Sequence, residues 1–249
     1  MLKSSSYRKN LFNIGNIFTN AFINLQVEIF SFVLNFITIL FYVFIFAGIL
    51  TKQFSSYLEF LVPGLILMSV LASVSYQGLK IWSLGSPGNL MNYWLSLPYS
   101  ISAILVSFTF MAVFSSIFYV LPLILLSLWF HFEINVLNYV IIVILSSIFL
   151  FFINFGLVLY LFKTNSFIIV FNVSQPLMLR ISPVYYPLLY LPVFSLPLVF
   201  LNPLTWLVET LRGEINFYFF ISALIIADIV LFKLLVSYWQ KKIKLGEVQ

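Results

Sequence analysis

The chain has 249 residues, of which 63% are hydrophobic and 8% are charged, and its formal net charge is +5. An ordinary soluble domain carries about 25% charged residues, so this composition excludes a soluble enzyme and indicates a polytopic membrane protein. The positive charge is better explained by membrane topology than by nucleic-acid binding. The length allows about six spans of about 20 residues, so we expect one all-α transmembrane domain over residues 1–249.

Residues 1–28 are predicted to form a cytoplasmic tail and an interfacial helix. Basic residues at the start precede a stretch in which Leu11, Phe18 and Leu25 share one helical face and asparagines share the opposite face. This period is typical of a helix that lies in the plane of the membrane surface. A signal peptide is the competing interpretation, but the asparagines interrupt its apolar core and no small-x-small cleavage site follows.

Five apolar spans are expected within residues 29–181, at 29–50, 57–77, 101–129, 136–162 and the unusually short 166–181. A polar stripe in the first span includes Asn35 and Thr38, and it must face another helix or an aqueous path because unpaired polar groups in hydrocarbon are costly. Pro63 and Gly64 predict a kink in the second span. The lone His131 is interpreted as an interfacial anchor, since zinc would need three or four ligands.

The connection after the second span turns polar from Lys80 onward. Gly85, Pro87 and Gly88 predict a turn there, and residues 89–97 can form a short helix. A hydrophobic loop of this length on the cytoplasmic side can serve as a docking element. The alternative is an ordinary connector.

A proline-rich stretch at residues 182–215 is apolar enough for a bilayer but cannot form one helix, because Pro183, Pro187, Pro192, Pro197 and Pro203 interrupt it. We expect a re-entrant helical hairpin that lies against other spans at the mouth of a path. The sixth span follows within residues 216–240, and a cytoplasmic tail ends the chain at 241–249. With both termini in the cytoplasm, eight of the 12 lysines and arginines lie inside and three outside, which places the hairpin on the outer side.

Charged residues near and within the sixth span are candidates for chemistry. Glu209, Arg212 and Glu214 are expected to pair with one another at the water level rather than to act as acid and base. Asp228 lies near the middle of the span, where a charge is by default functional. It could relay protons, remain a neutral acid, or pair with Lys233, although the five-residue separation puts the two on different helix faces.

Sequence motifs for nucleotide binding or hydrolysis are absent from the chain. It contains no GxxxxGK[ST], GxGxxG, HExxH or GxSxG pattern, and no cysteine for a thiolate metal site. We therefore expect a protein that is not an enzyme and binds no cofactor of its own.

Several short motifs carry a family resemblance: YLEFLVPGLILMSV at 57–70, YWLSLPYS at 93–100, SPVYYP at 182–187 and NPLTWLVETLRG at 202–213. In this order the chain resembles the permease subunits of the type-2 ABC exporter family, and most closely the drug-resistance and nodulation-export branch. The proline–glycine and asparagine–proline pairs are the most specific parts. The similarity spans nearly the whole chain, although no single motif is long.

The resemblance implies six helices per subunit and two subunits, most simply a homodimer, around a central path in a prokaryotic plasma membrane. A separate cytoplasmic ATPase would bind ATP and Mg²⁺. A coupling loop toward that ATPase would consist of Ser86, Pro87, Gly88, Asn89, Leu90, Met91, Asn92 and Tyr93. Candidates for the translocation path, on the first, second and fifth spans, are Asn35, Thr38, Ser73, Asn172 and Gln175. The outer gate would comprise Pro183, Pro187, Pro192, Pro197, Asn202 and Pro203.

These expectations predict an exporter of an amphipathic cargo, whether drug, lipid or glycan, that works by alternating access. The alternative from another class is an ion-coupled secondary transporter that uses Asp228. A third possibility is a purely structural membrane subunit, in which Asn35→Leu would leave transport unchanged.

Overall fold

The computed structural model describes residues 29, 33, 36–38, 40–41, 45, 57–84, 100–129, 135–161 and 166–244. This part of the chain is all-α, as the sequence predicts. Its elements are α2 (Tyr57–Leu84), α4 (Ile101–Trp129), α5 (Val136–Leu161), α6 (Ser166–Ile181), η1 (Leu188–Tyr190), η2 (Val193–Ser195), α7 (Leu196–Leu201), α8 (Pro203–Leu211) and α9 (Phe217–Lys244).

Four of the described helices are long and apolar enough to cross a membrane. Their apolar segments are Phe60–Ile81, Ile101–Ile124, Val136–Leu161 and Phe217–Lys241, which agree with the predicted second, third, fourth and sixth spans. The chain is therefore a multi-span helical membrane protein. The predicted fifth span is α6, whose 16 residues would extend only about 24 Å, less than a hydrocarbon core of about 30 Å.

Other predicted elements fall outside the described residues. These are the interfacial helix within 1–28, His131, the tail beyond 244 and most of the first span. Of the first span, Ile29, Val33, Ile37 and Phe41 are described as helical and exposed. The total of six spans therefore stays a prediction.

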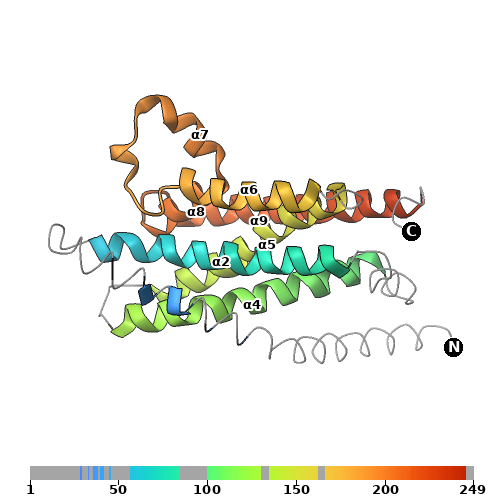
Figure 1. Cartoon of the computed structure of the whole chain (residues 1–249), viewed down its shortest axis with the longest axis horizontal. Helices are drawn as coiled ribbons and strands as arrows, with labels where there is room; N and C mark the ends of the chain where they lie inside the picture. The colour runs from blue at the N-terminus through green and yellow to red at the C-terminus, as the bar shows by residue number, and fades with distance from the viewer. Residues whose placement is uncertain are drawn as a thin grey trace.

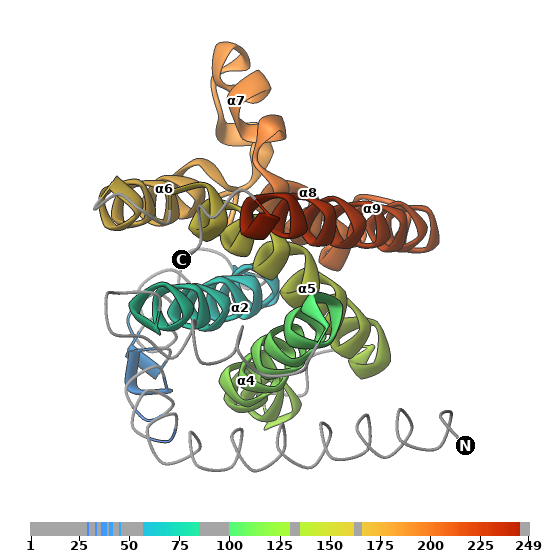
Figure 2. The same ribbon diagram turned by 90° about the vertical axis from the view of Figure 1, so that its right-hand side faces the viewer.

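The long helices lie side by side and alternate in direction along the chain (Figure 1). Helices α2, α4 and α5 pack against one another, and α9 packs mainly on α5. Figure 2 shows α6 and α9 on the side of α5 that is away from α4, with α7 projecting from that side. Helices α2, α5 and α9 all begin at the end of the bundle where the hairpin lies (Figure 1). The hairpin and the first residues of three helices thus lie at the same end of the bundle.

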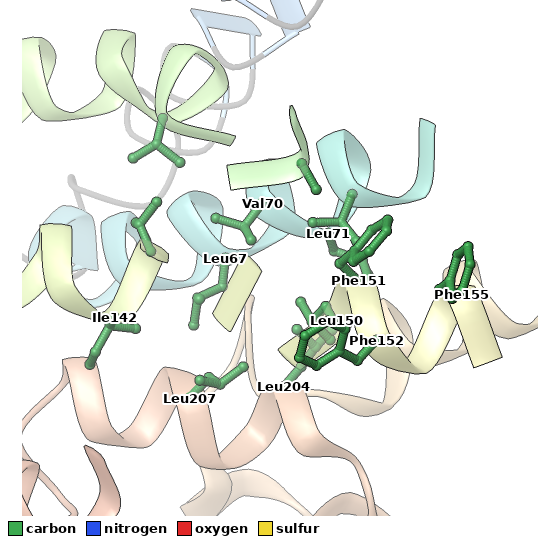
Figure 3. Packing of buried hydrophobic residues seen from close by; sticks show 14 of the residues in the cluster. Leu67, Val70, Leu71, Ile142, Leu150, Phe151, Phe152, Phe155, Leu204 and Leu207 are labelled. Atoms are coloured by element: carbon green, nitrogen blue, oxygen red, sulfur yellow. The ribbon is translucent and has the colours of Figure 1, made fainter. Parts of the chain in front are cut away.

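The core lies between α2, α4 and α5 and is closed at the hairpin by α8. Leu67 and Leu71 of α2 lie near Phe151 of α5, while Leu204 and Leu207 of α8 approach from the other side (Figure 3). Of the apolar window of α2, 78% is buried, against 17% of that of α9. Helix α2 is therefore the central helix of the described bundle, and most of the surface of α9 is left uncovered by the rest of the described chain.

Helix α9 is held on α5 by one stripe of side chains. Leu224, Asp228, Leu235 and Trp239 are buried at helical spacing. The ring of Trp239 meets Phe155 of α5 edge-on at 5.2 Å between centroids. Asp228 is thus part of the packed stripe of α9 rather than of its exposed face.

Candidate functional site at the hairpin

The hairpin, residues 182–215, contains a broken helix pair. The segments Val193–Leu201 and Pro203–Leu211 meet at an angle of 95°. The break lies at Asn202, whose side-chain oxygen accepts a hydrogen bond from the Leu204 N–H at 3.1 Å and so caps α8. Pro203 occupies the first helical position, where its missing N–H is not needed. The predicted stretch thus contains a bent helix pair, while a re-entrant hairpin that enters the membrane stays a prediction.

The start of the hairpin completes the end of α6. Pro183 has no N–H to continue the helix, so side chains bind the last carbonyls instead. Asn202 donates to the Met178 carbonyl at 2.6 Å, Ser182 Oγ to that of Leu179 at 3.1 Å, and Tyr186 to that of Arg180 at 2.5 Å. The bend of the hairpin is therefore joined to the end of α6 through Asn202.

The turn after α6 lies directly on α2. A Cβ atom placed on Gly64 would stand 2.7 Å from the Val184 carbonyl oxygen, a distance that real Cβ atoms do not show. Gly64 is therefore required for this close approach. Nearby, the Tyr57 hydroxyl donates to the Tyr185 carbonyl at 3.0 Å and adds a second link between α2 and the turn.

Arg212 lies at the centre of this contact. Its Nε and Nη2 donate to the Phe60 carbonyl of α2 at 3.2 and 3.1 Å, and Nη2 also donates to the Val184 carbonyl at 3.2 Å. Its Nη1 donates to the Pro183 carbonyl at 2.7 Å and to Glu209 Oε1 at 3.0 Å. The guanidinium carbon is 3.5 Å from the centroid of the Phe60 ring.

The Arg212–Glu209 ion pair is almost fully buried, with the two side chains 7% and 8% exposed. Burial lowers the pKa of Arg212 to about 10, although the nearby Glu209 carboxylate opposes that shift. The guanidinium is therefore still charged at neutral pH. The predicted pairing within the acidic–basic cluster is confirmed for these two residues.

Backbone geometry at the end of α8 positions Arg212. Gly213 has a φ of +82°, and its N–H bonds to the Thr210 carbonyl while that of Glu214 bonds to the Glu209 carbonyl. These two bonds define a Schellman motif, which ends α8 with Arg212 as its C-cap residue. Residues 211–213 thus end α8 and place the side chain of Arg212 against α2 before α9 begins.

A cavity of about 740 Å³ opens between the hairpin and the starts of α2 and α5. Most of its wall is apolar, and its charged groups are the paired Arg212 and Glu209 together with the exposed Glu214. Its lining residues are Phe60, Pro63, Tyr139, Pro187, Leu188, Leu189, Phe200, Glu209, Leu211, Arg212, Glu214 and Ile215. The cavity therefore presents both apolar and polar surface.

The predicted gate residues divide between the base and the tip of the hairpin. Pro183 and Asn202 are buried in the base, Pro187 and Pro203 are half-buried, and Pro192 and Pro197 are exposed. We call residues 182–187 and 202–212 the base and residues 188–201 the tip. Most side chains of the base are buried or half-buried, whereas most side chains of the tip are exposed or half-exposed.

The structure describes four of the five predicted path residues, Thr38, Ser73, Asn172 and Gln175. Ser73 is 1% exposed and lies 3.4 Å from Ser116 Oγ between α2 and α4. Asn172 is exposed on α6, and the buried Nε2 of Gln175 has no hydrogen-bond partner among the described residues. Thr38 is exposed. Asn35 and the coupling-loop residues 86–93 lie outside the described residues, so these roles stay predictions.

The suggested pairing of Asp228 with Lys233 is wrong. Asp228 is 7% exposed, and neither of its carboxyl oxygens has a hydrogen-bond partner within the described ranges. Lys233 is exposed on another face of α9. Five residues rotate a helix by about 500°, which leaves the two side chains about 140° apart around the helix axis, so they cannot meet.

Phe60, Tyr139 and Val184 also belong to this site, and the sequence did not predict them. Phe60 and Val184 contribute backbone carbonyls, which no side-chain pattern reveals. Tyr139 follows the start of a predicted span, where an aromatic residue is ordinary. No local signal in the sequence links them to Arg212, and Phe60 lies 152 positions away from it.

No family model, curated protein or solved structure matches this chain. Among the residues that the structure describes, no group of three or more His, Asp or Glu side chains is placed to hold a metal ion. The function is therefore argued from the chain's own residues.

Proposed function

We propose that this chain is the membrane-spanning permease subunit of an exporter, which moves an amphipathic cargo outward with energy from a separate ATPase. The observation that carries the proposal is the bent α7–α8 pair, which lies beside a cavity of mixed apolar and polar lining at one end of an antiparallel helical bundle. Such a pair can cover or uncover the end of a path. The short motifs that resemble type-2 ABC permeases support the same function.

A polar residue on α6 supports assembly with a second copy. Asn172 is exposed on a helix whose neighbours Ile169, Val173 and Leu177 are also exposed. An amide that faces hydrocarbon is unfavourable, whereas it is satisfied against another helix or an aqueous path. Two copies related by symmetry around a path between them would provide both.

The test is purification of the tagged chain from its native membrane under mild detergent. We expect an ATP-binding protein to co-purify, Gly88→Trp in the predicted coupling loop to release it, and Gly88→Ala to retain it. Transport by the purified chain alone, driven by a proton gradient without an ATPase, would contradict the proposal.

A second candidate is an ion-coupled secondary transporter. The observation in its favour is Asp228, which is buried in α9 without a hydrogen-bond partner within the described residues. Intramembrane carboxyl groups often carry protons. This candidate predicts transport that depends on pH and is abolished by Asp228→Asn, whereas the exporter predicts transport that depends on ATP.

A further inference from the structure

Arg212 uses its whole hydrogen-bonding capacity within the chain. A guanidinium has five N–H hydrogens in a rigid fork, and the structure gives Arg212 five bonds, to the carbonyls of Phe60, Pro183 and Val184 and to Glu209. No donor remains for a bound anion. Although Arg212 lines the cavity, its hydrogen bonds join segments of the chain rather than bind a ligand.

The acceptors belong to three segments that are far apart in the sequence. Phe60 is in the first turn of α2, Pro183 and Val184 form the turn after α6, and Glu209 is in the last turn of α8. A charged, buried fork that bonds several carbonyls at once fixes both distance and orientation. The contact between Gly64 and Val184 fixes the same turn from the α2 side.

The tip of the hairpin is not held in this way. Leu189 is 89% exposed and Phe194 is 84% exposed. The tip joins α8 at Asn202, where the two helical segments meet at 95°. The base thus has tight links to α2, and the tip extends beyond a bend.

We propose that Arg212 is a positioning residue that latches the hairpin base onto the start of α2, so that the base moves together with α2. The latch rests on the proposed function only in its consequence: in a permease, any tilt of α2 would be passed directly to the hairpin. The bend at Asn202 would then convert a movement of the base into a larger displacement of the tip.

Substitutions can distinguish the role of the planar guanidinium group of Arg212 from the role of its positive charge. Lysine keeps the charge, but its single nitrogen cannot reach acceptors on three segments at once. Arg212→Lys should therefore release the base, whereas Glu209→Gln should keep it because the amide oxygen still accepts the Nη1 bond. Arg180→Lys is a matched control, since Arg180 is exposed at the end of α6.

The experiment is a double electron–electron resonance measurement on the full chain in nanodiscs. The chain has no native cysteine, so nitroxide labels can be placed on Ala72→Cys of α2 and Leu201→Cys at the end of α7, both exposed positions. Labelled chain is diluted with unlabelled chain so that only distances within one copy are read, and we expect one narrow distance distribution in the parent, Arg180→Lys and Glu209→Gln proteins. Arg212→Lys should add a second, longer distance.

A second label pair, Ala72→Cys with Leu137→Cys on α5, reports on the bundle alone and should not change in Arg212→Lys. An unchanged hairpin distance in Arg212→Lys would overturn the latch, and so would an equal change in both label pairs. A new distance in Glu209→Gln would overturn the role of the fork. Neither cargo nor ATPase is needed, so the latch and the exporter proposal can fail separately.

Discussion

The carbonyl oxygen of Val184 occupies the space that a side chain on Gly64 would need, 2.7 Å from the Cβ position. This contact joins the turn after α6 to the central helix of the bundle. The opposing group is backbone, which cannot rotate away as a side-chain tip would. A single methyl group at position 64 must therefore push the hairpin base and α2 apart.

We expect Gly64→Ala to lower the free energy of unfolding by about 3 kcal/mol, at the upper end of the usual cost of overpacking. Thermal unfolding of the purified protein in detergent measures it. Gly78→Ala on the same helix is the matched control, because its Cβ would meet Asn154 Cβ at an ordinary 3.6 Å. That control should be neutral or more stable by up to about 1 kcal/mol, since alanine favours a helix. Equal effects at both positions would contradict the close contact.

Asn202 makes two side-chain hydrogen bonds at the bend of the hairpin, one that caps α8 and one to the end of α6. Asn202→Ala removes the cap of α8, worth about 1 kcal/mol, and leaves the Met178 carbonyl without its side-chain donor. We expect the hairpin to open more often, so that chymotrypsin cleaves faster after Tyr190 and Phe194 at the exposed tip. The control is Gln240→Ala on the exposed surface of α9, which should leave the cleavage rate unchanged.

The helices themselves could be predicted because their signals are local. Long apolar runs define α4, α5 and α9, and each begins just after a residue that caps it. Ser100 Oγ accepts a hydrogen bond from Ala103, Asn135 Oδ1 from Asn138, and Asn216 Oδ1 from Phe219. Such caps act within three residues, so the helix starts follow from the sequence alone.

The latch could be predicted only in part. The spacing of Glu209 and Arg212 on one helix indicates an ion pair, and the structure confirms it. The other partners of Arg212 are backbone carbonyls, one of them 152 positions away, and every residue carries a carbonyl. Gly64 had a visible pattern, but its reason lies in a neighbour that only the folded chain brings close.

Asp228 was predictable only in part. Its position in an apolar run marks it as unusual, but the sequence leaves open whether it relays protons, remains a neutral acid or pairs with Lys233. In a helix, contact requires a separation of three or four residues. The separation of five puts Lys233 on another helix face, and the structure agrees that the two side chains do not pair.

A hydrogen bond between α2 and α4 offers a test of how the bundle is held. Gln77 Nε2 donates to Ser115 Oγ at 2.9 Å, and both side chains are buried. A double-mutant cycle with Gln77→Leu and Ser115→Ala should give a coupling energy of about 0.6 kcal/mol, the usual value between membrane helices. The cycle of Gln77→Leu with Ser195→Ala at the hairpin tip should give none. A coupling near zero for the first pair would contradict the contact.

The last prediction concerns the cost of the buried carboxyl group of Asp228. Both oxygens lack a hydrogen-bond partner within the described residues, and burying such a group costs about 1–3 kcal/mol by protein mutational data. Asp228→Val removes that cost at similar volume, so we expect a higher free energy of unfolding. Asp228→Asn should stay close to the parent because it keeps the polar atoms.

Two comparisons make this result decisive. Lys233→Met should leave stability unchanged, because Lys233 is exposed and makes no ion pair with Asp228. The free energies of unfolding are measured by titration with denaturing detergent. If Asp228→Val proves more stable and still supports ATP-driven export, the carboxyl group is dispensable and the ion-coupled transporter loses its only support. If a double variant shows that the effects of Asp228→Val and Lys233→Met on stability are not additive, the two residues are coupled after all and the packing of α9 described above is wrong.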